Sequence, residues 1–429
     1  MHEGTLLARL EERAAAGRPI GVAVVGGGVF ASLYLAQALR TPGIRIVGVA
    51  DLAPARVRER LVAAGWPEAA LAATVLTDDV PGLIATPGVD VVIEATGDAP
   101  AGVEHALMAI EQGCHVVMVN VEADALVGPL LARRAHAAGV VYTLAYGDQP
   151  ALICELVEWA RLSGFEVVCA GKGTKHLPAF HEVTPATVWD HYGLPPEQTA
   201  GLNAQMFCSF LDGTKSAVEM AAVANATGLV PQAQGLAFPP CGTGDLAVRL
   251  RPAGDGGVLD RTGTLEVVSS LHPDGAPVDG DLRWGVYVTI AAADRYVARA
   301  FAAYGVATSR DGRVAALWRP SHLVGLELGV SVARAALAGE PTGVAQAQIA
   351  EVACRAKRDL RAGEMVDGEG GDHVYGVLRA IGEGSATLPM GLARGARLVR
   401  DVARGDELRR ADVELAASGS AARLHAELA

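Results

Sequence analysis

The chain is poor in charged residues and in aromatics, and it lacks any long basic or apolar run. Charged residues make up 20% of the 429 residues and aromatics 5%, and 36 Lys and Arg face 48 Asp and Glu, which gives a net charge of −12. No cluster of Lys or Arg could neutralise a phosphate backbone, so we do not expect nucleic acid as a partner. The N-terminal segment carries acids among its bases and no long apolar core, so we expect neither a signal peptide nor a membrane span.

Cysteine is also scarce, because the chain has only six, with no CxxC motif and no Cys/His pair at zinc spacing. We interpret the six as buried thiols in a reducing cytoplasm, which predicts a cytoplasmic protein. Apolar residues make up 51% of the chain, as in globular proteins. The length calls for two or three domains, each with its own core.

The stretch from residue 22 to residue 32, VAVVGGGVFAS, carries the strongest motif of the sequence. A run of apolar residues leads directly into Gly26-x-Gly28-x-x-Ala31, and a helical pattern follows, which is the order of a dinucleotide-binding fingerprint. Gly26 permits a tight turn, Gly28 lets the main chain approach a pyrophosphate, and the N-terminus of the helix faces the anion. We therefore predict a site for NAD(H) or NADP(H). The predicted contacts in this turn are Gly26, Gly28, Val29 and Phe30.

Asp51 ends the second predicted strand, 44–50, 25 residues after Gly26. An acid at this distance accepts hydrogen bonds from the adenosine ribose and favours NAD, because it would repel the 2′-phosphate of NADP. Arg56 and Arg58 follow closely and could bind that phosphate, or could be ordinary solvated helix residues. The sequence leaves the choice between NAD and NADP open.

Apolar runs at 90–95, 115–119 and 140–145 alternate with helical segments, which predicts an α/β fold with a doubly wound parallel sheet, a Rossmann domain over residues 1–150. Ligands of such sheets bind beyond the carboxyl ends of the strands. The residues expected there, on the nicotinamide side, are Thr96, Gly97, Asn120 and Glu122.

A second, α+β domain is predicted over residues 151–349, with a helix at 151–162 and a strand at 165–170. The strand is followed by Gly-Lys-Gly-Thr-Lys-His, which we interpret as a glycine-flexed loop. The cationic side chains of this loop suit an anionic or polyhydroxylated substrate. The alternative is that the two lysines are ordinary surface residues. The loop residues proposed for the site are Lys172, Lys175 and His176.

Lys215 and Glu219 stand four residues apart on a predicted apolar helix and so share one face. They form either a structural ion pair or a catalytic pair, and we favour catalysis because burying charge is costly. Further strands are expected at 264–269 and 282–290, and a long helix from about 319 to 337. Candidate substrate-binding residues in this domain are Asn203, Asp212, Asn225 and His322.

Eight stretches together resemble one group of enzymes: VVGGGVFA, VVIEATG, HVVMVNVEAD, YGDQPA, GKGTK, DGTKSAVEMAAVANATGL, HLVGLELGVSVARAALAGEPTG and AKRDLRAGE. The group is the homoserine-dehydrogenase-like oxidoreductases with a C-terminal SAF domain, which includes enzymes similar to 1-deoxy-D-xylulose-5-phosphate reductoisomerase. The resemblance covers nearly the whole chain. It implies a Rossmann domain, a catalytic domain, a small β-rich SAF-like domain over residues 350–429, and a homodimer.

The resemblance implies hydride transfer to or from a small oxygenated, phosphorylated substrate by a reductoisomerase, with a simple dehydrogenase of a hydroxy acid or polyol as the alternative. Two departures set the chain apart from true homoserine dehydrogenases. Asn120-Val121 replaces their Asn-Lys, and the order of Lys215 and Glu219 is the reverse of their Asp and Lys.

For the chemistry we expect Lys215 to neutralise the developing alkoxide, with Lys172, Lys175 and Asn203 or Asn225 orienting the substrate. A rearrangement would also call for Mg²⁺ or Mn²⁺ to chelate vicinal oxygens. Asp148, Asp212 and Glu219 could supply oxygen ligands, but their spacing identifies no metal site.

Overall fold

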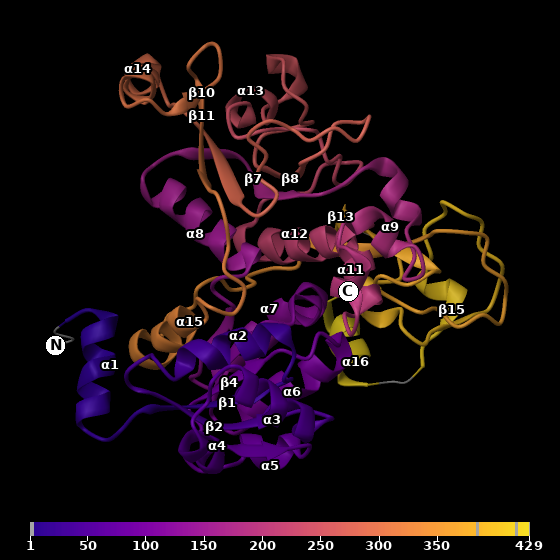
Figure 1. The fold of residues 1–429 in the computed structure, drawn as a ribbon. Coiled ribbons are helices and arrows are strands. Elements are labelled where there is room, and N and C mark those ends of the chain that lie inside the picture. Colours follow the sequence, from indigo (N-terminus) through magenta and orange to yellow (C-terminus); the bar gives the residue numbers. More distant parts are fainter. Residues whose placement is uncertain (1–3, 383–385, 417–418, 429) are drawn as a thin grey trace. The chain divides into compact units, whose positions relative to one another are not determined.

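The computed structural model describes residues 4–382, 386–416 and 419–428. The chain forms two compact units, each built from separate segments (Figure 1). Unit 1 consists of Met1–Leu152, Leu323–Gln346 and Ser420–Ala429, and unit 2 consists of Ile153–His322 and Ala347–Gly419. The predicted domain boundaries at residues 150 and 350 stay predictions.

Unit 1 is built on a six-stranded sheet in which every neighbouring pair is parallel, with the strand order β3-β2-β1-β4-β5-β6. This is the order of dinucleotide-binding folds, so the predicted doubly wound α/β architecture is confirmed. The central strands are continuous apolar runs because helices cover both faces of the sheet. The strands are β1 (Ile20–Val25), β2 (Ile44–Ala50), β3 (Val75–Thr77), β4 (Val91–Glu94), β5 (His115–Met118) and β6 (Tyr142–Leu144).

The helices of unit 1 follow the strands, and later parts of the chain complete the unit. Two segments return to it: one packs against α1 and α2, and the C-terminal helix packs against α6 and α7. The helices are α1 (Leu6–Ala15), α2 (Val29–Ala38), α3 (Pro54–Ala63), α4 (Glu68–Ala73), α5 (Val80–Ile84), α6 (Ala99–Glu111), α7 (Val121–Ala137), α15 (Gly329–Ala333), the π-helical turn η3 (Arg334–Ala338) and α16 (Ser420–Leu428); α8 (Gln149–Leu162) leads from unit 1 into unit 2.

The helix predicted from about residue 319 is wrong in its first half, because α15 begins only at Gly329. Gly325 adopts a φ of +72°, which a right-handed helix does not allow. It also lies so close to α2 that an added Cβ would stand 2.3 Å from the carbonyl oxygen of Phe30. This segment is therefore a turn that fits against unit 1.

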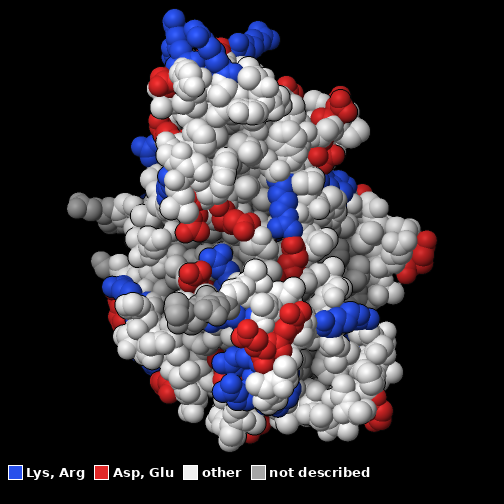
Figure 2. Space-filling model, turned by 90° about the vertical axis from the view of Figure 1, so that its left-hand side faces the viewer, with Lys and Arg blue, Asp and Glu red and all other residues white. Residues whose placement is uncertain are grey.

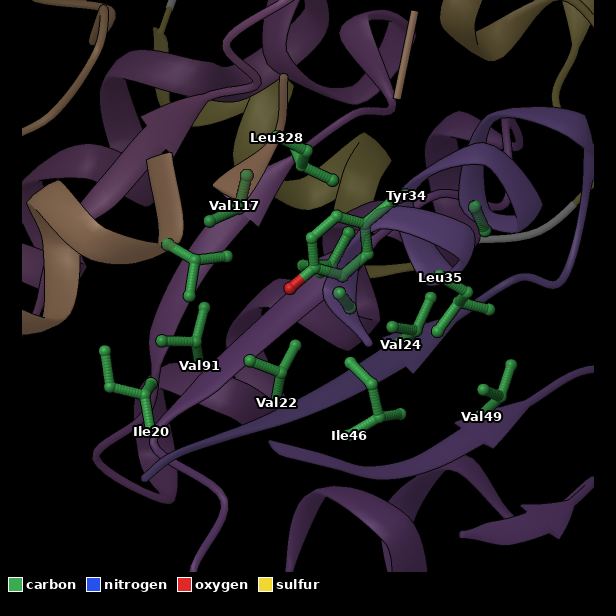
Figure 3. Close-up of a cluster of buried hydrophobic side chains, with 14 of the residues drawn as sticks. Ile20, Val22, Val24, Tyr34, Leu35, Ile46, Val49, Val91, Val117 and Leu328 are labelled. Carbon is green, nitrogen blue, oxygen red and sulfur yellow. The ribbon is translucent and has the colours of Figure 1, made fainter. Parts of the chain in front are cut away.

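The core of unit 1 lies between β1 and its neighbours on one side and α2 on the other (Figure 3). Val22 and Val24 of β1 are fully buried, and Tyr34 and Leu35 of α2 pack against the same cluster. Each such side chain contributes about 1.5–3 kcal/mol when it leaves water. The packing fixes the end of β1, and with it the start of α2.

Unit 2 contains a mixed five-stranded sheet in the order β10-β11-β9-β7-β8, in which β7 is parallel to β8 and antiparallel to β9. The α+β class predicted for this part of the chain agrees with this sheet. The strands are β7 (Glu166–Thr174), β8 (Thr264–Ser269), β9 (Val286–Ala291), β10 (Ala307–Thr308) and β11 (Val314–Arg319).

The loop predicted at residues 171–176 is wrong for its first four residues, because β7 continues to Thr174. The two glycines let neighbouring main chain approach closely, from β8 at Gly171 and from the segment before β9 at Gly173. A Cβ on Gly171 would lie 1.8 Å from the carbonyl oxygen of Glu266, and one on Gly173 would lie 2.0 Å from that of Leu282. Lys172, between them, is therefore a residue of a central strand.

The other elements of unit 2 are helices around this sheet and a β-rich C-terminal part. The long helix α12 packs against the antiparallel pair β12·β13. Whether the C-terminal part is a SAF domain stays a prediction. The elements are η1 (Pro178–Glu182), α9 (Val188–Tyr192), α10 (Pro196–Thr199), α11 (Ala204–Leu211), α12 (Thr214–Thr227), α13 (Leu246–Arg249), η2 (Ala253–Asp255), α14 (Arg295–Ala303), β12 (Ala350–Ala356), β13 (Val374–Ala380), η4 (Met390–Leu392), β14 (Arg397–Leu398), η5 (Arg410–Asp412) and β15 (Val413–Glu414).

Candidate functional site

The glycine turn after β1 has the geometry that a pyrophosphate needs. Gly26 has a φ of +93°, and an added Cβ would lie 2.7 Å from the carbonyl of Ala95, so only glycine fits. Gly28 is the N-cap of α2; no side chain caps the helix there, and an added Cβ would meet no atom within 4 Å. Val29 and Phe30 form the first turn behind it. The open N-terminus therefore fits an anion, and unit 1 can hold the pyrophosphate of NAD(P) here.

Asp51, at the end of β2, is tied to this turn. One carboxylate oxygen accepts a hydrogen bond from the N–H of Gly27 at 2.7 Å, and the other accepts one from Ala53 at 2.8 Å. The sequence did not single out Arg60, whose guanidinium donates to the carbonyl of Gly27. Arg58 forms an exposed ion pair with Glu68 at 2.9 Å.

The loop after β4 is held by a buried acid that the sequence analysis missed. Glu94 is fully buried, and its Oε1 accepts hydrogen bonds from the hydroxyl of Thr96 at 2.6 Å and from its N–H at 3.3 Å. Oε1 also lies 3.1 Å from Nδ1 of His105. Gly97 follows in a left-handed conformation, with no atom within 4 Å of an added Cβ. Glu94 therefore fixes the conformation of this loop, and the space next to Gly97 is open.

Asn120 connects this loop to the next helix. It is buried, it caps α7 through the N–H of Ala123, and its amide donates to the carbonyl of Asp98 at 2.8 Å and to the Thr96 hydroxyl at 3.3 Å. Thr96 and Asn120, both predicted for the nicotinamide side, are therefore in contact. The other predicted residue of this helix, Glu122, lies half-buried in the first turn of α7.

Two more acids lie near the carboxyl ends of these strands. Asp148, a proposed oxygen ligand, is buried after β6, and its Oδ1 accepts the N–H of Gln149 at 2.9 Å. Asp124 of α7 is fully buried and accepts a hydrogen bond from the hydroxyl of Tyr142 at 3.0 Å, while its Oδ2 has no hydrogen-bond partner among the described residues. Burial raises the pKa of Asp124 to about 7.

In unit 2 the ion pair of Glu219 is formed with Lys172, from a different element. Lys172 projects from β7 and Glu219 from α12, and the ammonium contacts Oε2 of the carboxylate. Both side chains are almost completely buried, at 7% and 6% exposure. Lys215, the predicted partner, lies half-exposed in the first turn of α12. Charge that is buried this deeply is costly unless it is paired, so the two groups depend on each other.

Lys175 and Asn203 cap helices in this structure. The ammonium of Lys175 donates to the carbonyls of His191 at 2.6 Å and Tyr192 at 3.0 Å, at the C-terminus of α9. Burial, and then the charge of Arg283, lowers the pKa of Lys175. Asn203 is the exposed N-cap of α11. Their roles as substrate ligands stay predictions.

Asp212, also proposed for substrate binding, is fully buried and forms an ion pair with Lys357 at 2.8 Å. Lys357 also donates to the carbonyls of Val183 and Gly371 at 2.7 and 2.8 Å. Burial lowers the pKa of Lys357, but the Asp212 carboxylate and the Cys208 thiol more than offset it, so the pKa is raised. The pair joins the start of α12 to the C-terminal part of unit 2.

Asn225 and His322 lie in two further places. The side-chain oxygen of Asn225, on α12, accepts the N–H groups of Ile349 and Ala350 at 2.8 and 2.9 Å. The Nδ1 atom of His322 lies 2.6 Å from the carbonyl oxygen of Trp284. Asn225 thus anchors the start of β12.

His176 belongs to a row of rings at the start of α12. Its ring is tilted by 30° to that of Phe238 at a centroid distance of 4.0 Å. It also lies 4.8 Å from the ring of His181, which stacks on Tyr375 at 4.5 Å. The Nδ1 atoms of the two histidines lie 3.0 and 2.7 Å from the carbonyl oxygens of Leu211 and Asp212. Burial, with His181 nearby, lowers the pKa of His176 to about 3, and burial also lowers that of His181.

Phe238 in this row has a φ of 51°, the one positive value of a residue other than glycine in the described part of the chain. Such a conformation is a genuine outlier for a bulky side chain and has to be stabilised by its surroundings. Glu266 provides this by accepting the N–H groups of Ala237 and Phe238. The sequence gives no local signal for the row, because its four rings come from distant segments.

No group of three or more His, Cys, Asp or Glu side chains in the described residues could hold a metal ion. None of the described helices is both long enough and apolar enough to span a membrane. On the face drawn in Figure 2, Lys and Arg gather at the top of the view, and elsewhere basic and acidic side chains are interspersed.

Two known families match consecutive segments of the chain. Residues 21–144 match the family described as homoserine dehydrogenase, NAD binding domain, and residues 147–328 match the family described as oxidoreductase DRL, catalytic domain. No curated protein sequence matches the chain. The NAD-binding match contains the glycine turn, Asp51 and the loops after β4 and β5.

Several solved structures are distantly similar. An inositol dehydrogenase homolog from Azotobacter vinelandii, complexed with NAD+, is 24% identical over 40% of this chain and 46% of its own, with a TM-score of 0.30. Myo-inositol dehydrogenase from Lactobacillus casei is 13% identical over 40% and 50%, with a TM-score of 0.30. A probable dehydrogenase from Thermotoga maritima is 13% identical over 76% and 91%, with a TM-score of 0.39.

The chain thus spans about half the length of the two inositol dehydrogenase structures. Similarity at this level carries no argument about substrate or mechanism. The fingerprint, the parallel sheet and the two family matches are the stronger observations. They show a dinucleotide-binding fold with an NAD-binding family match over residues 21–144, followed by a segment similar to an oxidoreductase catalytic domain.

Proposed function

We propose that the chain transfers a hydride between the nicotinamide of NAD(P) and the carbonyl carbon of a small oxygenated substrate, and that Lys172 with Glu219 supplies the charge this reaction needs. The observation that carries the proposal is the buried ion pair between β7 and α12. It lies in the part of the chain that matches an oxidoreductase catalytic domain. The sequence analysis places Lys172 in the substrate loop, but it expects Lys215 to neutralise the alkoxide.

Bound NAD(P) would supply or accept the hydride. When a carbonyl is reduced, its carbon gains the hydride, the C=O π electrons move to oxygen, and the resulting alkoxide takes up one proton. An ammonium ion held in a dry environment stabilises that negative charge far better than one in water. Glu219 pairs with the Lys172 ammonium and holds its orientation, so in this mechanism Glu219 is a positioning residue. Oxidation of an alcohol runs through the same steps in reverse.

For the substrate, the resemblance supports a phosphorylated sugar and a reductoisomerase, in which a C–C rearrangement precedes reduction and Mg²⁺ or Mn²⁺ is required. A simple dehydrogenase of a hydroxy acid or polyol needs neither the rearrangement nor the metal. The same resemblance supports a homodimer, which light scattering of the purified protein checks.

A small panel of assays tests these proposals. The protein is incubated with NADH or NADPH and with deoxyxylulose phosphate, and with NAD+ or NADP+ and hydroxy acids, polyols or homoserine, each with Mg²⁺ and again with EDTA. Loss of deoxyxylulose phosphate turnover in EDTA supports the reductoisomerase. Turnover of a hydroxy acid or polyol that EDTA leaves unchanged supports the simple dehydrogenase instead. Absence of nicotinamide turnover with every compound would contradict both assignments.

A further inference from the structure

We propose that Arg60 binds the 2′-phosphate of NADP(H), so that the chain accepts NADP(H) in spite of the acid at the end of β2. The proposal rests on cofactor binding by unit 1 and identifies the residue that sets the cofactor preference. Sequence spacing directed attention to Arg56 and Arg58 for this task. In the structure, the arginine of α3 that contacts the glycine turn is Arg60, which follows both of them in the same helix.

The position of the adenosine ribose follows from the fold. In dinucleotide-binding folds the residue at the end of the second strand lies beside the ribose hydroxyls, and here this residue is Asp51. Both of its carboxylate oxygens already accept main-chain N–H groups, from Gly27 at 2.7 Å and from Ala53 at 2.8 Å. Hydrogen bonds of this kind stabilise the carboxylate and fix its position. Asp51 therefore holds the glycine turn in addition to facing the ribose.

Arg60, on α3, contacts the same turn. Its guanidinium donates to the carbonyl oxygen of Gly27, the residue whose N–H binds Asp51. One peptide residue thus connects the acid and the base at the ribose end of the site. No ion pair within 4.0 Å joins Asp51 and Arg60 among the described residues, so the N–H donors of the guanidinium are not taken up by that carboxylate.

The chemistry of the guanidinium suits a phosphate. Arginine carries five N–H donors in a rigid plane, and the contact with Gly27 uses one nitrogen, Nη1. The remaining donors can bind phosphate oxygens, and such charge-assisted bonds are about twice as strong as neutral ones. By comparison, Arg58 is turned to Glu68 in an exposed ion pair, and the side chain of Arg56 is exposed.

A structural role and a phosphate-binding role for Arg60 predict different effects of its loss on the dissociation constants of the two dinucleotides. If it only supported the carbonyl of Gly27, its loss would loosen the glycine turn and weaken both dinucleotides to the same extent. If it binds the 2′-phosphate, its loss would weaken NADP(H) selectively, because NAD(H) lacks that group. The ratio of the two dissociation constants separates these cases.

The test measures the dissociation constants of NADH and NADPH by fluorescence titration of the full-length protein and its variants. Arg60→Gln keeps an N–H donor for the Gly27 carbonyl but removes the charge, and Arg60→Lys keeps the charge. We expect Arg60→Gln to weaken NADPH about tenfold or more relative to NADH. Arg60→Lys should restore a large part of the loss. The matched controls Arg56→Gln and Arg58→Gln should leave the ratio unchanged.

Each other outcome overturns the inference. An unchanged ratio in Arg60→Gln, with or without an equal loss for both dinucleotides, would make Arg60 a structural residue only. A shift of the same size in Arg56→Gln or Arg58→Gln would move the phosphate contact to that arginine. A wild-type protein that binds neither dinucleotide would instead contradict the nicotinamide chemistry of the proposed function, so the two failures are distinguishable.

Discussion

The sharpest prediction concerns the ion pair between Lys172 and Glu219. Their side chains are 7% and 6% exposed, so removal of one partner leaves the other charge buried and alone. Breaking such a pair typically costs about 3–5 kcal/mol of unfolding free energy, whereas replacing both partners by apolar residues of similar volume is often neutral or stabilising. Stability and catalysis therefore respond differently to single and double substitution.

We expect Lys172→Met to lower the unfolding free energy by about 3–5 kcal/mol, and the double variant Lys172→Met/Glu219→Leu to recover it in large part. Turnover per folded molecule should fall roughly a hundredfold or more in both, because each lacks the ammonium group that stabilises the alkoxide. Affinity for NAD(H) should stay unchanged, since the glycine turn is built from other residues.

Urea unfolding measures the stability, and the change in nicotinamide absorbance with the substrate found in the panel measures turnover. Arg361→Met is the matched control, because this arginine forms an exposed ion pair with Asp401 in the same unit and has no proposed role in catalysis. It should lose little turnover. If the double variant regained wild-type turnover together with its stability, the pair would be structural and the proposed role of Lys172 would be refuted.

Substitutions at four other residues have expected outcomes as well. Asp124 has a pKa of about 7 in the folded chain against 3.8 unfolded, so its contribution to stability falls by about 4 kcal/mol between about pH 4 and pH 7. Asp124→Asn should therefore reduce the dependence of the melting temperature on pH over this range, and an unchanged slope would assign the titration to another group. Gly28→Val should fold normally yet lose NAD(H) binding in a fluorescence titration, whereas Gly26→Ala should lower the melting temperature, because its Cβ would collide with the main chain. Lys357→Met should cost about 3–5 kcal/mol in urea unfolding, because it leaves Asp212 buried without its partner, and a loss below about 1 kcal/mol would contradict this.

The sequence predicted the parts of the fold that are encoded locally. Residues 44–50 and 264–269 were predicted as strands and form β2 and β8 with those bounds. The glycine fingerprint was equally readable, because strand, turn and helix follow one another without interruption. Alternation of apolar runs with helical segments was enough to predict the parallel sheet.

The candidate site of unit 2 was less readable, because its contacts join distant segments. Helical spacing brought Glu219 together with Lys215, but the side chain that reaches it in the structure comes from β7. The two glycines in the sequence GKGTK predicted a flexible loop, but they lie in β7 and allow neighbouring main chain to approach closely. In the same way, nothing local to Asp212 reveals that Lys357 is its partner.

Transfer of a hydride to or from a carbonyl carbon can be followed with an isotope label on the nicotinamide. The protein is incubated with NADH or NADPH carrying deuterium at nicotinamide C4, in either stereochemical form, and with a carbonyl compound that it turns over. Mass spectrometry of the product locates the label. We expect one deuterium on the carbon that carries the new hydroxyl, from one of the two stereochemical forms. Product formed without deuterium from either form would contradict the proposed hydride transfer.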